Sequence, residues 1–311
     1  MNKKSIKWLE KNFKADLTDK NIIITGANSG IGFEVSYICA SLNANVFMAV
    51  RNKTRGEAAK EKILKDYPNA NIKLLPLDVS SIESIHEFAD SLSNNNIDVD
   101  IFYNNAGVLK ANRVSKDNIE LVMATNYIGT YLLNELLFDY FLTLNHRVKV
   151  IFTNSIAMYL AKIDYNDFFN ETKYKSFKAY CNSKLALTHY FINYTRKCEE
   201  KNVDAVLVHP GVTYTPLISK SFNKVIAKLA DLFMDFVFHK VDIAALSTMY
   251  LLNDNICNNT YVGPRGILGM SGLPKKKKIP KRIFNNYIKT VDFTADFIKE
   301  KFYNEIKEAG E

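Results

Sequence analysis

The sequence predicts an α/β fold in which helices cover both faces of a mostly parallel, doubly wound sheet. Short apolar runs alternate with segments of helical periodicity, and parallel neighbouring strands need such crossover helices between them. The 311 residues, 47% of them hydrophobic, suffice for one large core and show neither an internal repeat nor a long Gly-, Ser- or Pro-rich linker. We therefore expect one domain over residues 1–311, with about seven strands in the order 3-2-1-4-5-6-7.

Six apolar runs are the strand candidates, and a seventh strand follows late in the chain. The six runs are Ile22–Thr25, Asn45–Val50, Ile72–Leu75, Val99–Tyr103, Val148–Phe152 and Val203–Val208. The helical segments between them complete the alternation. The core of the domain is expected at about residues 17–270.

Two later segments break this rhythm. Large apolar residues recur at three- and four-residue spacing from Leu217 to Phe238, which predicts one or two amphipathic helices at about 214–240 beside the substrate. A basic tail at about 275–311 carries a helical pattern from Ile283 to Phe302, and we expect it to pack on the domain or extend from it.

The excess of positive charge is local. Of the net charge of +8, much falls in Lys275–Lys278 with Lys281 and Arg282. Such a cluster is most often a solvated loop. It also matches the loose pattern of a nuclear import signal, and peripheral membrane contact through this tail stays open, whereas no nucleic-acid partner is expected.

The cysteines and the N-terminus indicate a cytoplasmic protein. Cys39, Cys181, Cys198 and Cys257 are scattered without a CxxC pair, which argues against a disulfide framework and against zinc. No apolar run reaches eighteen residues, and Met1–Lys14 has no signal-peptide core. Peripheral attachment to the endoplasmic reticulum or to another organelle membrane is the alternative location.

A glycine-rich turn joins the first strand to the next helix. Thr25 is followed by Gly26-Ala27-Asn28-Ser29-Gly30-Ile31-Gly32 and then by a helix that we expect to begin near Phe33. Glycines keep such a turn tight and let backbone amides approach a pyrophosphate at the positive end of the helix. Gly26, Asn28, Ser29, Gly30, Ile31 and Gly32 are the predicted contacts to a dinucleotide.

The end of the second strand indicates which dinucleotide is bound. Arg51 stands where an NAD(H) site would carry an acidic residue for the ribose hydroxyls. A guanidinium group suits a 2′-phosphate, so NADP(H) is favoured over NAD(H). Asp78 and Val79, after the third strand, are expected beside the adenine, although Asp78 could equally be a helix N-cap.

A tyrosine and a lysine share one helix face. Tyr180 and Lys184 are four residues apart, so their side chains rise about one turn from each other. A nearby ammonium group favours the phenolate and would lower the pKa of Tyr180 towards neutrality, as suits a proton donor to a carbonyl oxygen. On its own this spacing is common by chance.

Further polar residues follow the later strands. Asn104–Gly107 follows the fourth strand, Asn126 lies in the next helical segment, Ser155 follows the fifth strand and Pro210–Thr215 the sixth. In a parallel sheet these positions meet at the carboxyl edge, where ligands bind.

The ordered set of motifs resembles the short-chain dehydrogenase/reductase family, over essentially residues 17–270. Its TGxxxGxG loop, NNAG motif, Asn-Ser-Tyr-Lys tetrad and Pro-Gly turn are all present in order. The nearest resemblance is to retinol dehydrogenase-like and WW-domain oxidoreductase-like members, through Thr25–Gly32, Arg51-Asn52, Lys162–Asp167, Lys178–Lys184, His209–Gly211 and Tyr261–Gly266. Two departures are Asn154, where relatives usually have serine, and the lack of an N-terminal membrane anchor before the fold.

The resemblance implies a Rossmann-type fold, hydride transfer with NADP(H), and roles for individual residues. Tyr180 is the general acid or base, Lys184 lowers its pKa and binds the nicotinamide ribose, and Ser155 bonds the substrate oxygen. Asn126 holds a water that links Lys184 to solvent, and Thr215 contacts the carboxamide. The remaining cofactor contacts are Asn105, Ala106, Gly107, Pro210, Gly211 and Thr213, and no metal is needed.

The expected substrate is a lipophilic aldehyde, ketone or alcohol, such as a retinoid, steroid or lipid-derived carbonyl, because the segment after the sixth strand is so apolar. A hydrolase is a poor alternative, since no GxSxG motif occurs. Two alternatives stay open, a non-catalytic NADP(H)-binding sensor or scaffold and an enzyme like protochlorophyllide reductase. The sequence leaves the oligomeric state open, a homo-oligomer included.

Overall fold

The structure is a computed structural model, and it describes residues 1–109, 114–172, 174–212, 240–266 and 269–304. Thr213, Thr215 and the predicted helices between Leu217 and Phe238 lie outside the described residues. Within them, no helix is both long and apolar enough to cross a membrane.

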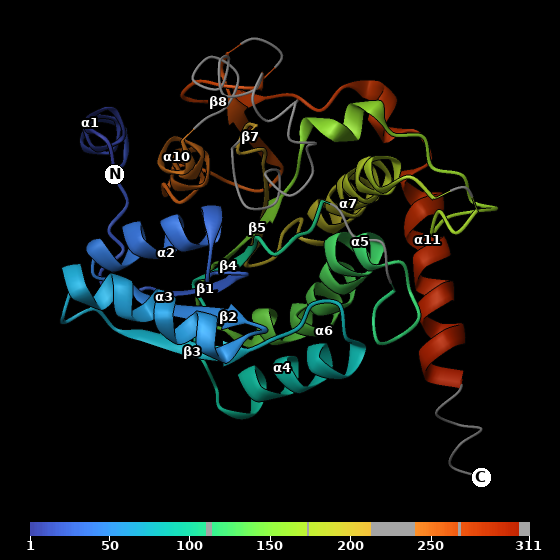
Figure 1. Cartoon of the computed structure of the whole chain (residues 1–311), viewed down its shortest axis with the longest axis horizontal. Coiled ribbons are helices and arrows are strands. Elements are labelled where there is room, and N and C mark those ends of the chain that lie inside the picture. The colour runs from blue at the N-terminus through green and yellow to red at the C-terminus, as the bar shows by residue number, and fades with distance from the viewer. Residues whose placement is uncertain (110–113, 173, 213–239, 267–268, 305–311) are drawn as a thin grey trace, which may run out of the picture.

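One eight-stranded sheet runs through the described part of the chain, in the order β3-β2-β1-β4-β5-β6-β7-β8 (Figure 1). Neighbours from β3 to β7 are parallel, and β8 is antiparallel to β7. The strands are β1 (Asn21–Thr25), β2 (Asn45–Val50), β3 (Ile72–Pro76), β4 (Ile101–Asn104), β5 (Val148–Thr153), β6 (Val203–Val208), β7 (Thr260–Pro264) and β8 (Pro274–Lys277). The predicted doubly wound fold and its order of seven strands are confirmed.

The eighth strand corrects one prediction. Lys275–Lys278 were expected in a solvated loop or basic tail, but Lys275, Lys276 and Lys277 pair with Gly263, Val262 and Tyr261 of β7. Backbone groups make these pairs, so the ladder does not need apolar side chains, and lysines are common on edge strands because they discourage pairing with other chains. The region is therefore a polar sheet edge.

Helices cover both faces of the sheet. They are α1 (Lys3–Asn12), α2 (Gly30–Ser41), α3 (Lys53–Asp66), α4 (Ile82–Asn94), α5 (Leu121–Met123), α6 (Gly129–Thr143), α7 (Ser176–Lys197), α10 (Val241–Leu251) and α11 (Tyr287–Ile298). Shorter turns of helix occupy Ala124–Ile128, Ile156–Leu160, Lys281–Phe284 and Lys299–Asn304. Helices α1, α2, α3 and α10 contribute to one buried cluster, and α4, α6, α7 and α11 to the other.

The alternating direction of side chains along each strand explains the two buried clusters. In β1, Ile22 and Ile24 belong to one cluster and Ile23, between them, to the other. All three are essentially inaccessible to solvent. Because successive side chains of a strand point to opposite faces, a strand covered on both sides reads as a continuous apolar run, as the sequence does here.

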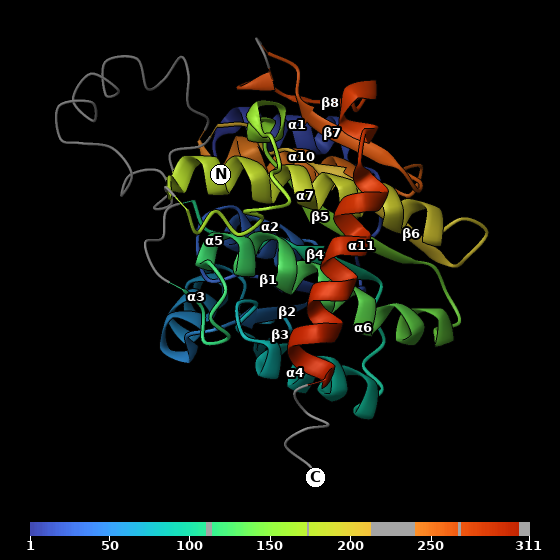
Figure 2. The same ribbon diagram turned by 90° about the vertical axis from the view of Figure 1, so that its right-hand side faces the viewer.

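The C-terminal helix packs on the domain, which is one of the two placements that its pattern left open. In Figure 2, α11 crosses in front of α7. The His189 Nδ1 and Thr290 Oγ1 atoms lie 2.7 Å apart, and the hydroxyls of Tyr127 and Thr294 are also 2.7 Å apart. Since these four polar side chains are buried and hydrogen-bonded, they fix how the helix sits on the domain.

Candidate active site

The loop after β1 has the shape that a phosphate group requires. Gly26 adopts a φ of 65°, and a Cβ on it would lie 3.0 Å from the Ala106 Cα. A Cβ on Gly32 would collide with the Asn105 Nδ2 and lie 2.7 Å from the Gly26 oxygen. Helix α2 begins at Gly30, three residues earlier than expected, so its amino end opens directly onto the loop.

Asn28, Ser29 and Ile31 lie in the same loop, and each is at least partly exposed. The first amide groups of a helix have no partner within it, so such amides and accessible side chains stand together at the start of α2, beside the close backbone at Gly26 and Gly32. The residues present therefore fit the pyrophosphate of a dinucleotide.

Thr25 connects this loop to the end of β4 by hydrogen bonds. The sequence did not indicate this role. The Thr25 Oγ1 accepts hydrogen bonds from the backbone nitrogens of Asn105 and Ala106, each at 2.9 Å. In return the Asn105 Nδ2 donates to the Thr25 oxygen at 2.8 Å. Asn105 and Ala106 are thereby placed beside the glycine loop, and the contact of these two residues and Gly107 with the cofactor stays a prediction.

Arg51 and Asp78 meet at the ends of β2 and β3. The Arg51 Nη1 and the Asp78 Oδ2 are 3.5 Å apart, and the arginine side chain is 62% exposed. Asp78 does not cap the following helix: Ser81 is the N-cap of α4, and the Asp78 Oδ1 accepts from the Ser80 nitrogen and hydroxyl. Val79 is buried. Because the ion pair of Arg51 with Asp78 is long and the arginine is exposed, its guanidinium group is available to a phosphate.

Asn126 lies in a π-helical turn, Ala124–Ile128, between α5 and α6. Its Oδ1 accepts from the Val108 nitrogen at 2.7 Å, while its Nδ2 donates to the Val108 oxygen at 2.8 Å and to the Ser183 Oγ at 3.1 Å. Single π-helical turns inside helices are often found at functional sites. The side chain joins the loop after β4 to α7, and the water that it would hold stays a prediction.

Tyr180, Lys184 and Ser155 come together at the carboxyl edge. The Lys184 side chain is buried, its Nζ donates to the Thr153 oxygen at 2.9 Å, and it lies 5.9 Å from the centre of the Tyr180 ring. The Ser155 side chain lies near enough to that of Tyr180 to lower the pKa of the tyrosine. Both Tyr180 and Ser155 are half-buried, so their hydroxyls can reach a bound carbonyl oxygen.

The pKa values differ from expectation in one respect. Burial lowers the pKa of Lys184 to about 8. Burial raises the pKa of Tyr180, and the nearby Ser155 side chain opposes this only in part. The predicted lowering of the tyrosine pKa by Lys184 is thus wrong for the protein alone, because desolvation of the phenolate is the larger effect and the ammonium points at the Thr153 carbonyl.

Asn154 is a second residue whose role the sequence did not reveal. Its Nδ2 donates to the Thr188 Oγ1 on α7 at 2.5 Å, and its Oδ1 accepts from the Ser155 nitrogen at 2.7 Å. Asn154 therefore fixes Ser155 relative to the helix that carries Tyr180 and Lys184. A serine at this position has a shorter side chain and could not span the same two groups.

The Pro-Gly turn after β6 borders the same edge. Pro210 is buried, Gly211 has a φ of 93°, and the Val212 nitrogen donates to the Met270 oxygen at 2.9 Å. The predicted contacts Thr213 and Thr215 come directly after these residues, outside the described part of the chain.

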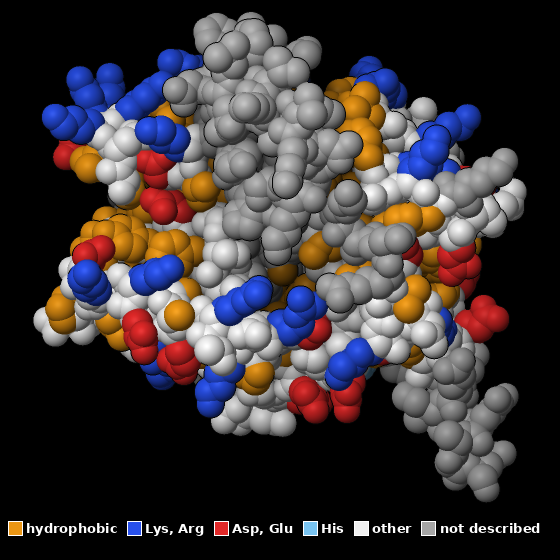
Figure 3. All heavy atoms as spheres, viewed as in Figure 1, with side chains coloured by type: hydrophobic (Ala, Val, Ile, Leu, Met, Phe, Trp, Pro, Cys, Tyr) orange, Lys and Arg blue, Asp and Glu red, His pale blue; other side chains and the backbone are white. Residues whose placement is uncertain are grey.

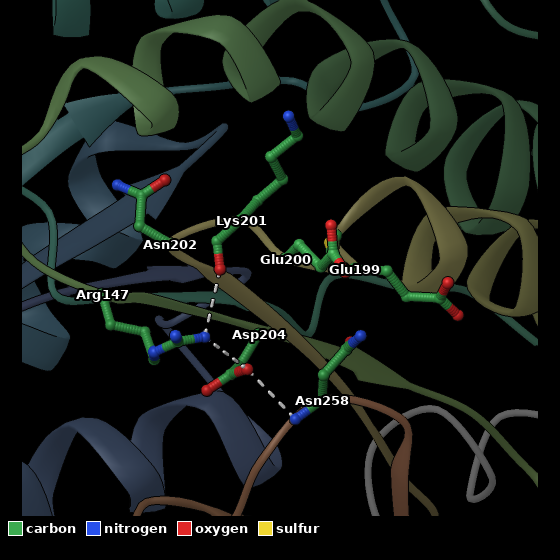
Figure 4. Close-up of a pocket in the computed structure, with 8 residues that line it drawn as sticks. Arg147, Glu199, Glu200, Lys201, Asn202, Asp204 and Asn258 are labelled. Carbon is green, nitrogen blue, oxygen red and sulfur yellow. Dashed lines mark hydrogen bonds and ion pairs between the residues drawn. The ribbon is translucent and has the colours of Figure 1, made fainter.

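A hollow at the other edge of the sheet is unlike this site (Figure 4). It lies at the amino ends of β5 and β6, where Arg147 donates to Asp204 at 3.0 Å and to the Lys201 oxygen at 3.2 Å. The Asp204 Oδ1 also accepts from the Asn258 nitrogen at 3.1 Å, so Arg147, Asp204 and Asn258 are engaged with one another. The catalytic candidates lie at the opposite, carboxyl edge.

Residues 20–226 match the family model for short chain dehydrogenases. The chain belongs to the short-chain dehydrogenase/reductase family. A short-chain dehydrogenase of this kind is an oxidoreductase that acts on CH–OH or C=O groups with a nicotinamide cofactor, so the oxidoreductase class inferred above is confirmed.

A curated relative supports the family assignment, and two solved structures share the fold. Human retinol dehydrogenase 12 is 30% identical over 280 residues, which cover 86% of this chain and 85% of the relative. A structure described as an NAD(P)-dependent gluconate 5-dehydrogenase of Beutenbergia cavernae, with bound NADP, has a TM-score of 0.62, 18% identity and coverage of 77% and 91%. A short-chain dehydrogenase/reductase of Burkholderia phymatum in complex with NAD has a TM-score of 0.60, 17% identity and coverage of 77% and 87%.

Proposed function

We propose that this chain is an NADP(H)-dependent oxidoreductase that transfers a hydride between nicotinamide and a lipophilic aldehyde, ketone or alcohol. The observation that carries the proposal is the meeting of Tyr180, Ser155 and Lys184 at the edge that also holds the glycine loop. The likeness to human retinol dehydrogenase 12 supports the same substrate class.

The protein's own residues supply the proton chemistry. A bound nicotinamide would supply the hydride for the carbonyl carbon, or accept it in the reverse reaction. Ser155 and Tyr180 hydrogen-bond the substrate oxygen, and as negative charge develops there the Tyr180 hydroxyl transfers its proton to it. The raised pKa of Tyr180 keeps the hydroxyl protonated at neutral pH, so the free protein is set to act as the acid in a reduction.

Lys184 supplies a positive charge beside Tyr180. With a pKa of about 8 it is mostly charged at neutral pH. We propose that its ammonium group binds the nicotinamide ribose and stabilises the Tyr180 phenolate that forms when the proton leaves, which completes the reduction and readies the reverse reaction.

The preference for NADP(H) rests on Arg51. We expect Arg51→Ala to weaken NADPH binding by about tenfold to a hundredfold and to leave NADH binding nearly unchanged, because an Arg–phosphate contact contributes roughly 1.5–3 kcal/mol. Calorimetric titration of both cofactors measures this, with Lys62→Ala on the exposed side of α3 as the control. Equal affinity of the unaltered protein for NADPH and NADH would show that the assignment is wrong.

The lipophilic substrate is tested with a homologous series. Each added methylene of a straight-chain aldehyde should raise kcat/KM by up to about 0.8 kcal/mol, or about fourfold, until the pocket is full. The rate is followed by NADPH oxidation, with a carboxylate-bearing aldehyde of equal length as the control. A flat series, or faster turnover of the charged aldehyde, contradicts the proposal.

A non-catalytic NADP(H) sensor or scaffold is the second candidate. It would use the glycine loop and Arg51 in the same way, but a binding module has no need for Ser155 and Tyr180 side by side next to a buried lysine. Turnover of any carbonyl in the panel that depends on Tyr180 decides for the enzyme.

A further inference from the structure

The first helix is fixed to the domain on one side only. Trp8 is buried, with its ring centre 6.3 Å from that of Tyr250 on α10. The Ser5 Oγ and the Asn2 nitrogen both donate to the Asp242 Oδ2, at 3.0 and 2.7 Å. These contacts determine which side of α1 faces the domain and therefore which side faces outward.

The outward side of α1 is basic. Lys3, Lys4, Lys7 and Lys11 are exposed, and Glu10 is the only exposed carboxylate of this helix. None of the four lysines forms an ion pair with any residue that the structure describes. Ile6 lies among them with 45% of its surface exposed, and Met1 with 41%.

A second basic segment, residues 274–284, is far from α1 in the sequence but lies in the same part of the molecule. Both α1 and β8 pack against α10, and Figures 1 and 2 place them together at the top of the molecule. Figure 3 shows lysine and arginine side chains gathered over α1. The exposed cations of these two segments, here named the basic face, are Lys3, Lys4, Lys7, Lys11, Lys275, Lys276, Lys278, Lys281 and Arg282.

Cations outnumber carboxylates on this part of the surface, where Glu10 of α1 is exposed and Glu34 of α2 is partly exposed. Residues 274–284 contain no acidic residue, and Asp242 of α10 is buried against α1. Protection of a sheet edge would explain the lysines of β8 but not those of α1, which is a helix. The basic face thus combines charges from both ends of the chain over one supporting helix.

We propose that the basic face docks on an anionic lipid surface. Lysines near such a surface are attracted to its headgroups, and apolar side chains between them can enter the boundary with the acyl chains. Met1 and Ile6 among the lysines of α1, and Phe284 beside Arg282, supply these apolar groups. They favour a lipid surface over a nucleic acid, whose backbone offers no apolar layer.

The test is sedimentation of the full chain with vesicles of phosphatidylcholine alone or with about one third phosphatidylserine. Binding should require the anionic lipid and should weaken strongly as salt screens the charges. Each lysine contributes about fivefold, so Lys4→Gln with Lys7→Gln should lower the partition coefficient by about twenty-five-fold, and Lys276→Gln with Lys278→Gln by a similar factor.

The matched control is Lys62→Gln with Lys65→Gln, which removes the same charge from exposed positions of α3, beside β3 at the opposite end of the sheet. It should bind vesicles nearly as well as the unaltered protein. No binding to anionic vesicles at low salt, or an equal loss in the control, overturns the proposal.

Ile6→Ser distinguishes a lipid surface from another polyanion. It should reduce vesicle binding and leave binding to a DNA oligonucleotide unchanged, because only the bilayer gains from the apolar side chain. Binding to the oligonucleotide without binding to vesicles overturns the lipid assignment. None of these measurements uses turnover, so their failure is separable from failure of the proposed function.

Discussion

Tyr180→Phe is expected to abolish turnover while leaving cofactor binding nearly unchanged. The substitution removes the hydroxyl that would give its proton to the substrate oxygen and keeps the half-buried ring. Proton transfer by a positioned side chain typically accelerates a reaction by about 10² to 10⁴, so kcat should fall by at least that factor. NADPH oxidation with the best aldehyde of the series, together with calorimetric titration of NADPH, measures both quantities.

Helix α7 itself offers the matched control for this experiment. Tyr194 is a fully buried tyrosine whose hydroxyl has no hydrogen-bond partner within the described residues. Tyr194→Phe removes the same atom from the same helix and should leave kcat unchanged, with a stability equal to or slightly above that of the unaltered protein. If Tyr180→Phe retained most of its activity, the proton would have to come from another group.

The sheet was predictable because its strands are buried on both faces. Continuous runs such as Ile22–Thr25 and Val203–Val208 coincide with β1 and β6 to within a residue. The run Val99–Tyr103 is less well placed, since β4 covers Ile101–Asn104. No pattern of apolar residues marks β8, whose lysines join the sheet through backbone hydrogen bonds that a sequence pattern does not report.

The site residues that directly follow strands could be predicted from the sequence. Those that act through hydrogen bonds to residues far away in the sequence could not. Asn154 acts through Thr188, thirty-four positions away, and Thr25 through Asn105, eighty positions away. Neither pairing leaves a local signal. The direction of the Tyr180 pKa shift was wrong for a related reason, because the spacing of Tyr180 and Lys184 gives their proximity but not the burial that outweighs it.

Lys184→Met is expected to change both turnover and the pH dependence of stability. Without the ammonium group, kcat should fall and NADPH should bind more weakly, since the proposed ribose contact is lost. The unaltered protein holds Lys184 with a pKa of about 8, well below 10.5 in the unfolded chain, so folding must either keep a buried charge or release a proton. The resulting loss of folding free energy is fully present below about pH 8.

The sign of the pH effect follows from linkage. Between about pH 8 and 10.5 the unfolded chain binds more protons than the folded one, so the free energy of unfolding of the unaltered protein gains up to about 3 kcal/mol from this group as pH rises. Lys184→Met lacks this gain, so its stability relative to the unaltered protein should decline over the same interval. Lys178→Met, an exposed position of α7, should leave the difference constant. Urea unfolding at pH 7 and pH 10 compares the three proteins, and parallel pH dependence of Lys184→Met and the unaltered protein would mean that Lys184 carries no depressed pKa.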